Sequence, residues 1–236
     1  GVVRAWACGL IAVVAGSAVL PSDVSAASRK GTSRVLAAGP QCPASGTQAI
    51  GFAKALDGTS FVTADGREVR LAGVLTPENA GEAARQALAA LLQTGGLALA
   101  SADSERDRFG RIVAEVFANG AWVQGNLLKA GMLRMTPDRS SAPCAKELIA
   151  AEEEARAMRA GHWRDGVFSL STPQQLGGRV GSFQTVEGIV TTATTYKGRA
   201  YINFGADYRS DFTVTIAPPD MKLFRTARFD VKKLAG

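Results

Sequence analysis

The sequence is poor in the residue types from which many catalytic and metal sites are built. It has one histidine, His162, in 236 residues, which argues against a histidine-based catalytic triad or a metal site with several histidines. His162 follows Gly161, which is expected to end a helix, and we assign it no catalytic role. With three cysteines, the chain is also not a small scaffold held together by many disulfides.

The charge of the chain is mild and unevenly distributed. Charged residues make up 20% and hydrophobic residues 46%, a composition that excludes intrinsic disorder and collagen-like repeats. The net charge of +6 permits an acidic partner without requiring one. Residues 47–166 have a net charge of −1 and residues 180–236 one of +3, so the basic excess lies outside the longer of these two regions.

The first thirty residues predict a secretory signal peptide over residues 1–26. Arg4 precedes the apolar run Ala5–Leu20, and Pro21 and the small residues Val24–Ala27 follow it, which is the order of a basic start, an apolar core and a cleavage site. The alternative is an uncleaved membrane anchor, although about 16 apolar residues are fewer than the roughly 20 that span a bilayer. We therefore expect an exported protein, periplasmic or secreted, that meets a membrane only if this segment is not cleaved.

Removal of the signal peptide leaves two cysteines, Cys42 and Cys144. In an oxidising compartment we expect them to form one disulfide, which closes a loop across the main domain. The alternative is two unpaired, buried thiols.

Composition divides the rest of the chain into four segments. Residues 27–46, rich in Ser, Gly, Pro and Ala, predict a flexible lead-in, and residues 47–166 predict the main domain. Residues 167–179 predict a linker, and residues 180–236, rich in Thr, Val, Ile, Tyr and Phe, predict a β-rich extension. The length suits one full domain and a smaller one.

Hydrophobic periodicity predicts an α+β fold for the main domain. The expected strands are residues 48–56, 59–64, 67–74, 97–101 and 111–117, and the expected helices are residues 78–92, 122–130 and 145–159. We expect Val62, Val69 and Leu71 on an inward, apolar face. The run Glu152–Glu154 predicts a solvated helix face with one glutamate tied to the barrel. This order of elements is that of a small β-barrel with packed helices.

Several strings of residues in this domain occur in the order of one protein family. They are Leu56–Ser60, Val69–Glu78, Asp107–Ala114, Asn126–Gly131, Ala151–Arg156 and Gly161–Trp163. Over residues 48–165 the chain resembles the staphylococcal nuclease-like (thermonuclease) family, in an exported bacterial form with a C-terminal β extension. The resemblance implies a five-stranded OB-fold barrel with three helices, and an endonuclease that hydrolyses phosphodiester bonds of DNA or RNA.

The resemblance also implies working residues for such a nuclease. It assigns Arg70 and Arg111 to the scissile phosphate and Glu78 to activation of the attacking water. A planar guanidinium can hold two phosphate oxygens and stabilise the charge of the transition state, and a carboxylate can orient or deprotonate water. The alternatives are structural: a carboxylate partner for Arg70, a favourable first-turn acid at Glu78, and an ion pair of Arg111 with Asp103 or Asp107.

The sequence departs from the family at the expected calcium ligands. The resemblance places Thr59 and Leu75 where the family has two aspartates that bind Ca²⁺. Ca²⁺ takes about six to eight oxygen ligands, which a hydroxyl and an alkyl chain do not supply, and we expect the nearby Asp57 to form a turn. We therefore predict no metal ligands, no small-molecule cofactor, and a hydrolase whose transition state has lost several kcal/mol of stabilisation. The alternative is a non-catalytic module that binds nucleic acid or a protein.

The extension adds a second group of candidate residues. Its expected strands are residues 186–192, 200–205 and 211–216. The candidate nucleic-acid-binding residues are Tyr196, Lys197, Arg199, Tyr201 and Arg209, because aromatic side chains beside cations bind single strands. The alternative is core aromatics with ordinary surface charges. About three strands are too few for a closed barrel, so we expect a partial, OB-like extension that is cut short at the C-terminus.

Overall fold

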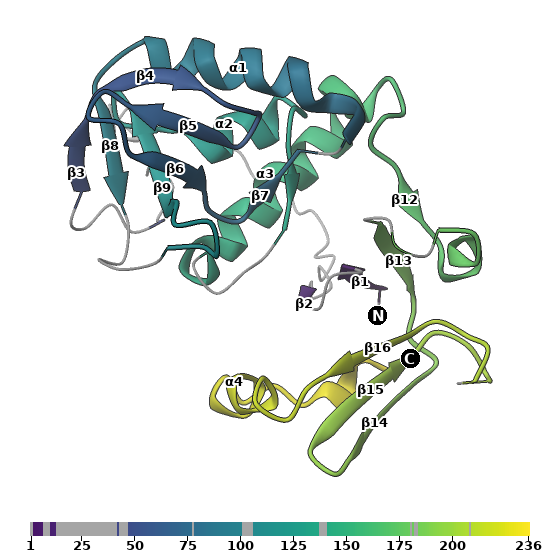
Figure 1. The fold of residues 1–236 in the computed structure, drawn as a ribbon. Helices are drawn as coiled ribbons and strands as arrows, with labels where there is room; N and C mark the ends of the chain where they lie inside the picture. Colours follow the sequence, from purple (N-terminus) through teal and green to yellow (C-terminus); the bar gives the residue numbers. More distant parts are fainter. Residues whose placement is uncertain are drawn as a thin grey trace, which may run out of the picture. The chain divides into compact units, whose positions relative to one another are not determined.

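The structure, a computed structural model, describes residues 2–6, 10–12, 42, 47–76, 78–100, 106–136, 141–179, 181, 184–207 and 209–236. The chain divides into two compact units (Figure 1): residues 40–169 make the larger unit, and residues 1–39 with 170–236 make the smaller unit. The division lies within the segment 167–179, for which a linker is predicted. In the described part of the chain, no helix is both long and apolar enough to cross a membrane.

Within the described residues, the larger unit combines β-strands with three α-helices. Its strands are β3 (Thr47–Ile50), β4 (Phe52–Ala55), β5 (Ser60–Thr63), β6 (Glu68–Leu71), β7 (Val74–Leu75), β8 (Leu97–Ala100), β9 (Ile112–Ala118), β10 (Ala121–Trp122) and β11 (Arg134–Met135). Its helices are α1 (Gly81–Gln93), α2 (Val123–Lys129) and α3 (Ala145–Ala157), with 3-10 helices η1 (Glu78–Ala80), η2 (Ala142–Cys144) and η3 (Gly161–Trp163). This mixture confirms the predicted α+β class.

The main sheet of the larger unit curls because one continuous stretch of chain forms both of its outer strands. The strand order is β3-β8-β9-β6-β5-β4. Its outer strands, β3 and β4, are separated in the chain only by Gly51, and they pair with β8 and β5 respectively. A side chain at position 51 would place its Cβ 2.7 Å from that of Ala64, so glycine lets the chain between β3 and β4 pass close to Ala64. Residues far apart in sequence, on β5, β6 and β9, thereby become neighbours.

The helices form where the sequence predicts them. The predicted helix 78–92 begins as the 3-10 turn η1 and continues as α1, and the predicted helices 122–130 and 145–159 are α2 and α3. α1 packs beside β4, α2 beside β9, and α3 against α2 (Figure 1). The predicted bounds of α2 and α3 differ from the observed ones by at most two residues.

The apolar face of the β5–β6 hairpin differs by one residue from the prediction. Val69 and Leu71 are fully buried as expected, but Val62 is only half-buried. In the register of the hairpin, Phe61 lies opposite Val69, and Val62 lies opposite the exposed Glu68. Cross-strand partners point to the same side of a sheet, so Phe61, and not Val62, occupies the core position.

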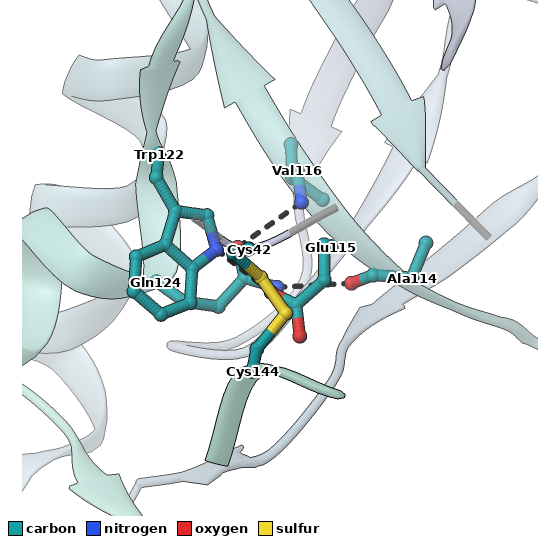
Figure 2. Close-up of a disulfide and its surroundings, with 7 residues drawn as sticks. All are labelled: Cys42, Ala114, Glu115, Val116, Trp122, Gln124 and Cys144. Carbon is teal, nitrogen blue, oxygen red and sulfur yellow. Dashed lines mark hydrogen bonds between the residues drawn. A yellow bond between two sulfur atoms is a disulfide. The ribbon is translucent and has the colours of Figure 1, made fainter. Parts of the chain in front are cut away.

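The predicted disulfide between Cys42 and Cys144 is confirmed, and the alternative of two free thiols is wrong. Both residues are buried, their Cα atoms are 4.9 Å apart, and 102 positions separate them in the chain. Figure 2 shows the bond in yellow beside Glu115 and Trp122, and a Glu115 carboxylate oxygen lies within 4.8 Å of both sulfur atoms. Because both sulfurs are oxidised, this cluster does not offer thiolates to a metal ion.

Buried polar side chains hold β9 to β10 and to α2 beside the disulfide. The Glu115 carboxylate accepts a hydrogen bond from Trp122 Nε1 at 2.7 Å. The fully buried Gln124 accepts a hydrogen bond from the Val116 N–H at 3.1 Å and donates one to the Ala114 carbonyl at 2.9 Å (Figure 2). A shift of α2 along β9 would leave these buried groups unsatisfied.

A buried ion pair ties α3 to β11. Glu152 is 4% exposed; its carboxylate accepts a hydrogen bond from the Met135 N–H at 2.6 Å and lies 3.5 Å from Arg134 Nε. Burial raises the pKa of Glu152, against the lowering effect of Arg134. The Arg134 guanidinium lies 4.4 Å from the centroid of the Trp163 ring. One glutamate of the run Glu152–Glu154 is therefore tied to a strand, β11, which pairs with β7 and lies outside the main sheet.

The described residues of the smaller unit form two sheets, one α-helix and two 3-10 helices. The strands are β1 (Val2–Trp6), β2 (Leu10–Ala12), β12 (Leu170–Ser171), β13 (Thr185–Ile189), β14 (Thr192–Tyr196), β15 (Arg199–Asn203) and β16 (Thr213–Ile216), and the helices are η4 (Pro173–Leu176), α4 (Met221–Thr226) and η5 (Val231–Leu234). The sheets have the orders β12-β13-β1-β2 and β14-β15-β16. β1 and β2 lie in the predicted signal peptide, of which the rest is outside the described residues, so the signal peptide stays a prediction.

The extension is organised differently from the three strands that its sequence predicts. The expected strand 186–192 is divided between two sheets, because β13 pairs with β12 and β1 while β14 pairs with β15. Helices α4 and η5 are not predicted by the sequence pattern; their residues Met221 and Leu234 pack with Ile202 against one face of β14-β15-β16. Within the described residues, the extension is therefore an open sheet with one covered face and does not close into a barrel.

Candidate functional site

Neighbouring strands of the larger unit place two arginines around one serine. Ser60 on β5 lies directly opposite Arg70 on β6, so their side chains share one face of the sheet. Arg111, immediately before β9, donates a hydrogen bond from Nη1 to Ser60 Oγ at 3.2 Å. Two of the three predicted site residues of this unit are thus brought together.

The turn that precedes Arg111 fixes the orientation of its side chain. Arg111 Nε and Nη2 lie 2.8 and 2.7 Å from Asp107 Oδ2, and the Arg111 N–H donates to Asp107 Oδ1 at 3.1 Å. Partial burial raises the pKa of Asp107, but hydrogen bonds from Arg111 and from the Phe109 N–H outweigh it and bring that pKa below its ordinary value. The structural alternative of an Arg111–Asp107 pair is therefore seen, and Asp103 lies outside the described residues.

Arg70 has a different environment. Its side chain is half-buried, and its Nη2 lies 3.5 Å from the Val74 carbonyl oxygen, a long distance for a hydrogen bond. No carboxylate of the described residues pairs with Arg70. The structural alternative for Arg70 is thus not seen in this part of the chain, and its charge is available to an anionic ligand.

The same turn exposes an aromatic ring that the sequence pattern does not single out. Phe109 is 66% exposed, and the guanidinium carbons of Arg108 and Arg111 lie 4.7 and 5.2 Å from its ring centroid. The signal available in the sequence is an aromatic residue within a charged turn, Asp107–Gly110, that ends in a glycine with a φ of 81°. The Phe109 ring therefore lies beside both Arg108 and Arg111.

The residues at the expected calcium position do not fit a Ca²⁺ ion. Thr59 is buried, and its N–H and hydroxyl both donate to Asp57 Oδ1, at 2.7 and 2.9 Å, so Asp57 forms the turn as predicted. Leu75 supplies only an alkyl side chain. Thr76 Oγ1 is buried and has no hydrogen-bond partner in the described part of the chain, but it is one neutral oxygen. Ca²⁺ requires about six to eight oxygen ligands with enough negative charge to replace its water.

Glu78 begins the 3-10 helix η1, which leads directly into α1. Its backbone follows β7, the short strand that pairs with β11. The Glu78 side chain lies outside the described part of the structure, so its assignment to the attacking water stays a prediction.

Four of the five candidate residues of the smaller unit lie together at one end of the β14-β15-β16 sheet. Tyr196 and Arg199 lie directly opposite each other, and Tyr201 is two residues further along β15, on the same face. Lys197, in the turn between the strands, has its Nζ 5.3 Å from the centroid of the Tyr196 ring. Tyr196 is 62% exposed, so the alternative of a core aromatic does not apply to it.

Arg209 lies apart from these four residues. It belongs to the loop between β15 and β16, at the opposite end of β15 from Lys197. Its N–H donates to Asp207 Oδ1 at 3.0 Å, and the Asp207 N–H donates to Asp211 Oδ2 at 2.8 Å. The direction of β15 thus separates Arg209 from the tyrosines, although it is close to them in the sequence.

Comparison with known proteins finds a family match within the larger unit. Residues 68–165 match the family described as staphylococcal nuclease homologue, a range that includes Arg70, Glu78 and Arg111. The chain is also similar to an uncharacterized 38.1 kDa protein of Capnoides sempervirens, with 34% identity over 98 residues. That match covers 40% of this chain and 28% of the relative, so the chain spans less than a third of the relative's length. The resemblance found in the sequence is confirmed over residues 68–165, which are similar to the staphylococcal nuclease homologue family.

Proposed function

We propose that this domain hydrolyses phosphodiester bonds of DNA or RNA as an endonuclease. The observation that carries the proposal is that Arg70 and Arg111 both lie beside Ser60. Both arginines belong to the range that matches the family. Two neighbouring guanidinium groups suit a phosphate with several anionic oxygens. The strand order supports an OB barrel as the scaffold. Its two outer strands, β3 and β4, belong to one continuous stretch of chain and pair with β8 and β5 respectively.

The two arginines have different tasks in this proposal. Asp107 and Ser60 hold Arg111 in one orientation before substrate arrives, and such preorganisation lowers the cost of stabilising charge in the transition state. Arg70, which has no carboxylate partner among the described residues, contributes an uncompensated positive charge. Glu78 would orient the attacking water or accept its proton. Because the residues at the calcium position do not fit Ca²⁺, stabilisation of the phosphate rests on the arginines.

We expect the protein to cut single-stranded DNA and the Glu78→Gln variant to have lost this activity. The substitution retains the size of the side chain and removes the proton acceptor, so we expect a rate about 10²- to 10⁴-fold lower. Cleavage is measured with end-labelled DNA in Ca²⁺, Mg²⁺, Mn²⁺ or EDTA.

The matched control for this experiment is Glu82→Gln. Glu82 is another acid at the start of α1, but it pairs with Arg85 at 2.6 Å on an exposed surface, so its loss should leave the rate unchanged. If folded wild-type protein cuts nothing in any of the four buffers, the nuclease proposal is refuted.

Restoring both aspartates is expected to create a calcium site. In the variant Thr59→Asp with Leu75→Asp, the new carboxylate at position 59 lies beside Asp57, which Thr59 contacts, and position 75 precedes Thr76, which lies against Gly58. Ca²⁺ binding should relieve the repulsion between these carboxylates. Ca²⁺ at 100 times its Kd should stabilise this variant by about 2.7 kcal/mol, as measured by unfolding with and without CaCl₂. The neutral variant Thr59→Asn with Leu75→Asn is the control. A stabilisation of the wild type by Ca²⁺ would show that our interpretation of these positions is wrong.

The second candidate function is a non-catalytic module that holds nucleic acid or a protein. The lack of calcium ligands at Thr59 and Leu75 favours it. In that case neither the wild type nor Glu78→Gln cuts DNA, and both bind it with the same dependence on salt.

We also infer that the chain is exported to the periplasm or secreted. The disulfide between Cys42 and Cys144 supports an oxidising compartment. The basic start and apolar run of residues 1–26 support the same inference.

A further inference from the structure

The β14-β15-β16 sheet has one polar face that the nuclease proposal does not use, and we call it the tyrosine face. In the register of the sheet, three rows of side chains cross it: Thr192, Asn203 and Thr213; Thr194, Tyr201 and Thr215; and Tyr196 with Arg199. None of the three strands contains an aspartate or a glutamate.

In the first of these rows, the side chains form hydrogen bonds with one another. Asn203 Nδ2 donates to Thr192 Oγ1, and Thr213 Oγ1 donates to Asn203 Oδ1, both at 2.9 Å. Among the described residues of this face, the side chains without such bonds are those of the second and third rows, toward the turn between β14 and β15.

Positive charge and aromatic surface coincide at that turn. Arg199 lies opposite Tyr196, and the Lys197 ammonium lies 5.3 Å from the centroid of the Tyr196 ring. No carboxylate in the described part of the chain pairs with Lys197 or Arg199. Tyr201 is the diagonal neighbour of Tyr196 across the two strands, a separation that large side chains can bridge.

The opposite face of the sheet holds the core of this unit. There Ile202 packs with Met221 of α4 and Leu234 of η5. On the tyrosine face, Tyr196 is 62% exposed and Thr194 and Thr215 are exposed as well, while Tyr201 and Arg199 are half-buried. The face therefore offers binding groups that the core does not need.

We propose that the tyrosine face binds single-stranded nucleic acid, independently of cleavage by the larger unit. Tyr196 and Tyr201 each stack on one base, and Lys197 and Arg199 contact the neighbouring phosphates. Aromatic side chains beside cations hold single strands in this way without recognising sequence. A duplex keeps its bases stacked on one another, so it offers this face only phosphates and binds more weakly.

The test is binding of the full chain to fluorescein-labelled oligo(dT) and oligo(U), measured by fluorescence anisotropy. Every protein in the test contains Glu78→Gln and Arg70→Ala, which removes cleavage and weakens binding at the larger unit. Tyr196→Leu with Tyr201→Leu is expected to raise Kd at least tenfold, because loss of one stacking ring weakens binding about five- to 150-fold. Phenylalanine at both positions retains the rings and is expected to restore tight binding.

The cation variants provide the matched control. Lys197→Ala with Arg199→Ala is expected to raise Kd and to reduce its dependence on salt. Lys222→Ala with Arg225→Ala removes two exposed cations from α4, on the covered side, and should leave Kd unchanged.

Three outcomes overturn the proposal. The first is an unchanged Kd in the variant Tyr196→Leu with Tyr201→Leu when its melting curve shows that it is folded. The second is equal affinity of the protein for duplex and single-stranded DNA. The third is an equal change in Kd for the pair Lys197→Ala with Arg199→Ala and the pair Lys222→Ala with Arg225→Ala. Cleavage by the wild type is assayed separately: if the wild type cuts nothing while the tyrosine substitutions still weaken binding, the nuclease proposal is refuted and this one is supported.

Discussion

Arg111→Ala is expected to lower the rate of DNA cleavage about 10²- to 10³-fold. Asp107 and Ser60 orient the Arg111 guanidinium in the folded protein, so the variant loses a donor that is already aligned when charge builds on the phosphate. Arg111→Lys should recover little of the rate, because an ammonium group lacks the planar fork that holds two oxygens. The rate is measured under single-turnover conditions with end-labelled single-stranded DNA.

Arg70→Ala should cause a loss of similar size, and Arg67→Ala is the matched control for both variants. Arg67 also pairs with an aspartate, Asp65, at 2.8 Å, but it belongs to the turn between β5 and β6 and does not contact Ser60. Its removal should leave the cleavage rate within about twofold of the wild type, as surface pairs of this kind contribute about 1 kcal/mol or less. Equal losses in Arg67→Ala and Arg111→Ala would mean that the arginines act only through general charge or stability.

Cys42→Ala with Cys144→Ala is expected to lower the free energy of unfolding by about 2 to 5 kcal/mol. The disulfide links residues 102 positions apart, and a crosslink over a long loop restricts the unfolded chain strongly. Both cysteines are buried beside Glu115 and Trp122, so the substitutions also remove packed atoms from the core. Equilibrium unfolding in urea, followed by tryptophan fluorescence, measures the change.

Reduction provides an independent check of the disulfide prediction. A thiol reductant should lower the stability of the wild type toward that of the doubly substituted protein and should leave that protein unchanged. Equal stability of the wild type and the doubly substituted protein, both without reductant, would contradict the structural role of the bond between Cys42 and Cys144.

The hairpin of β5 and β6 shows what a local pattern of apolar residues leaves undecided, namely which residue of an apolar pair faces the core. Phe61 and Val62 are consecutive apolar residues, so alternation alone allows either one to face the core. Pairing with Val69 selects Phe61. The run Glu152–Glu154 presents the same difficulty on a helix, because the sequence does not say which of three adjacent acids meets Arg134.

The smaller unit shows the same limit on a larger scale. Its strands are rich in β-branched residues and are detected by composition, but the division of the expected strand 186–192 depends on partners elsewhere in the chain. The same holds for Arg209, which the direction of β15 carries away from Tyr196 and Lys197. Helix α4 is not detected by the sequence pattern because it has only six residues (Met221–Thr226), which is less than two turns.

Local pattern was sufficient for the family resemblance, the α+β class, the positions of the main helices and the cysteine pair. Periodicity, turn residues and a short list of cysteines are visible along one chain. The arrangement of the candidate site required the tertiary structure. Arg111 reaches Ser60 and Arg70 lies opposite Ser60 only because β5, β6 and β9 pair in one register. Register is set by the burial of whole strand faces against the core, and that burial involves residues from all parts of the domain.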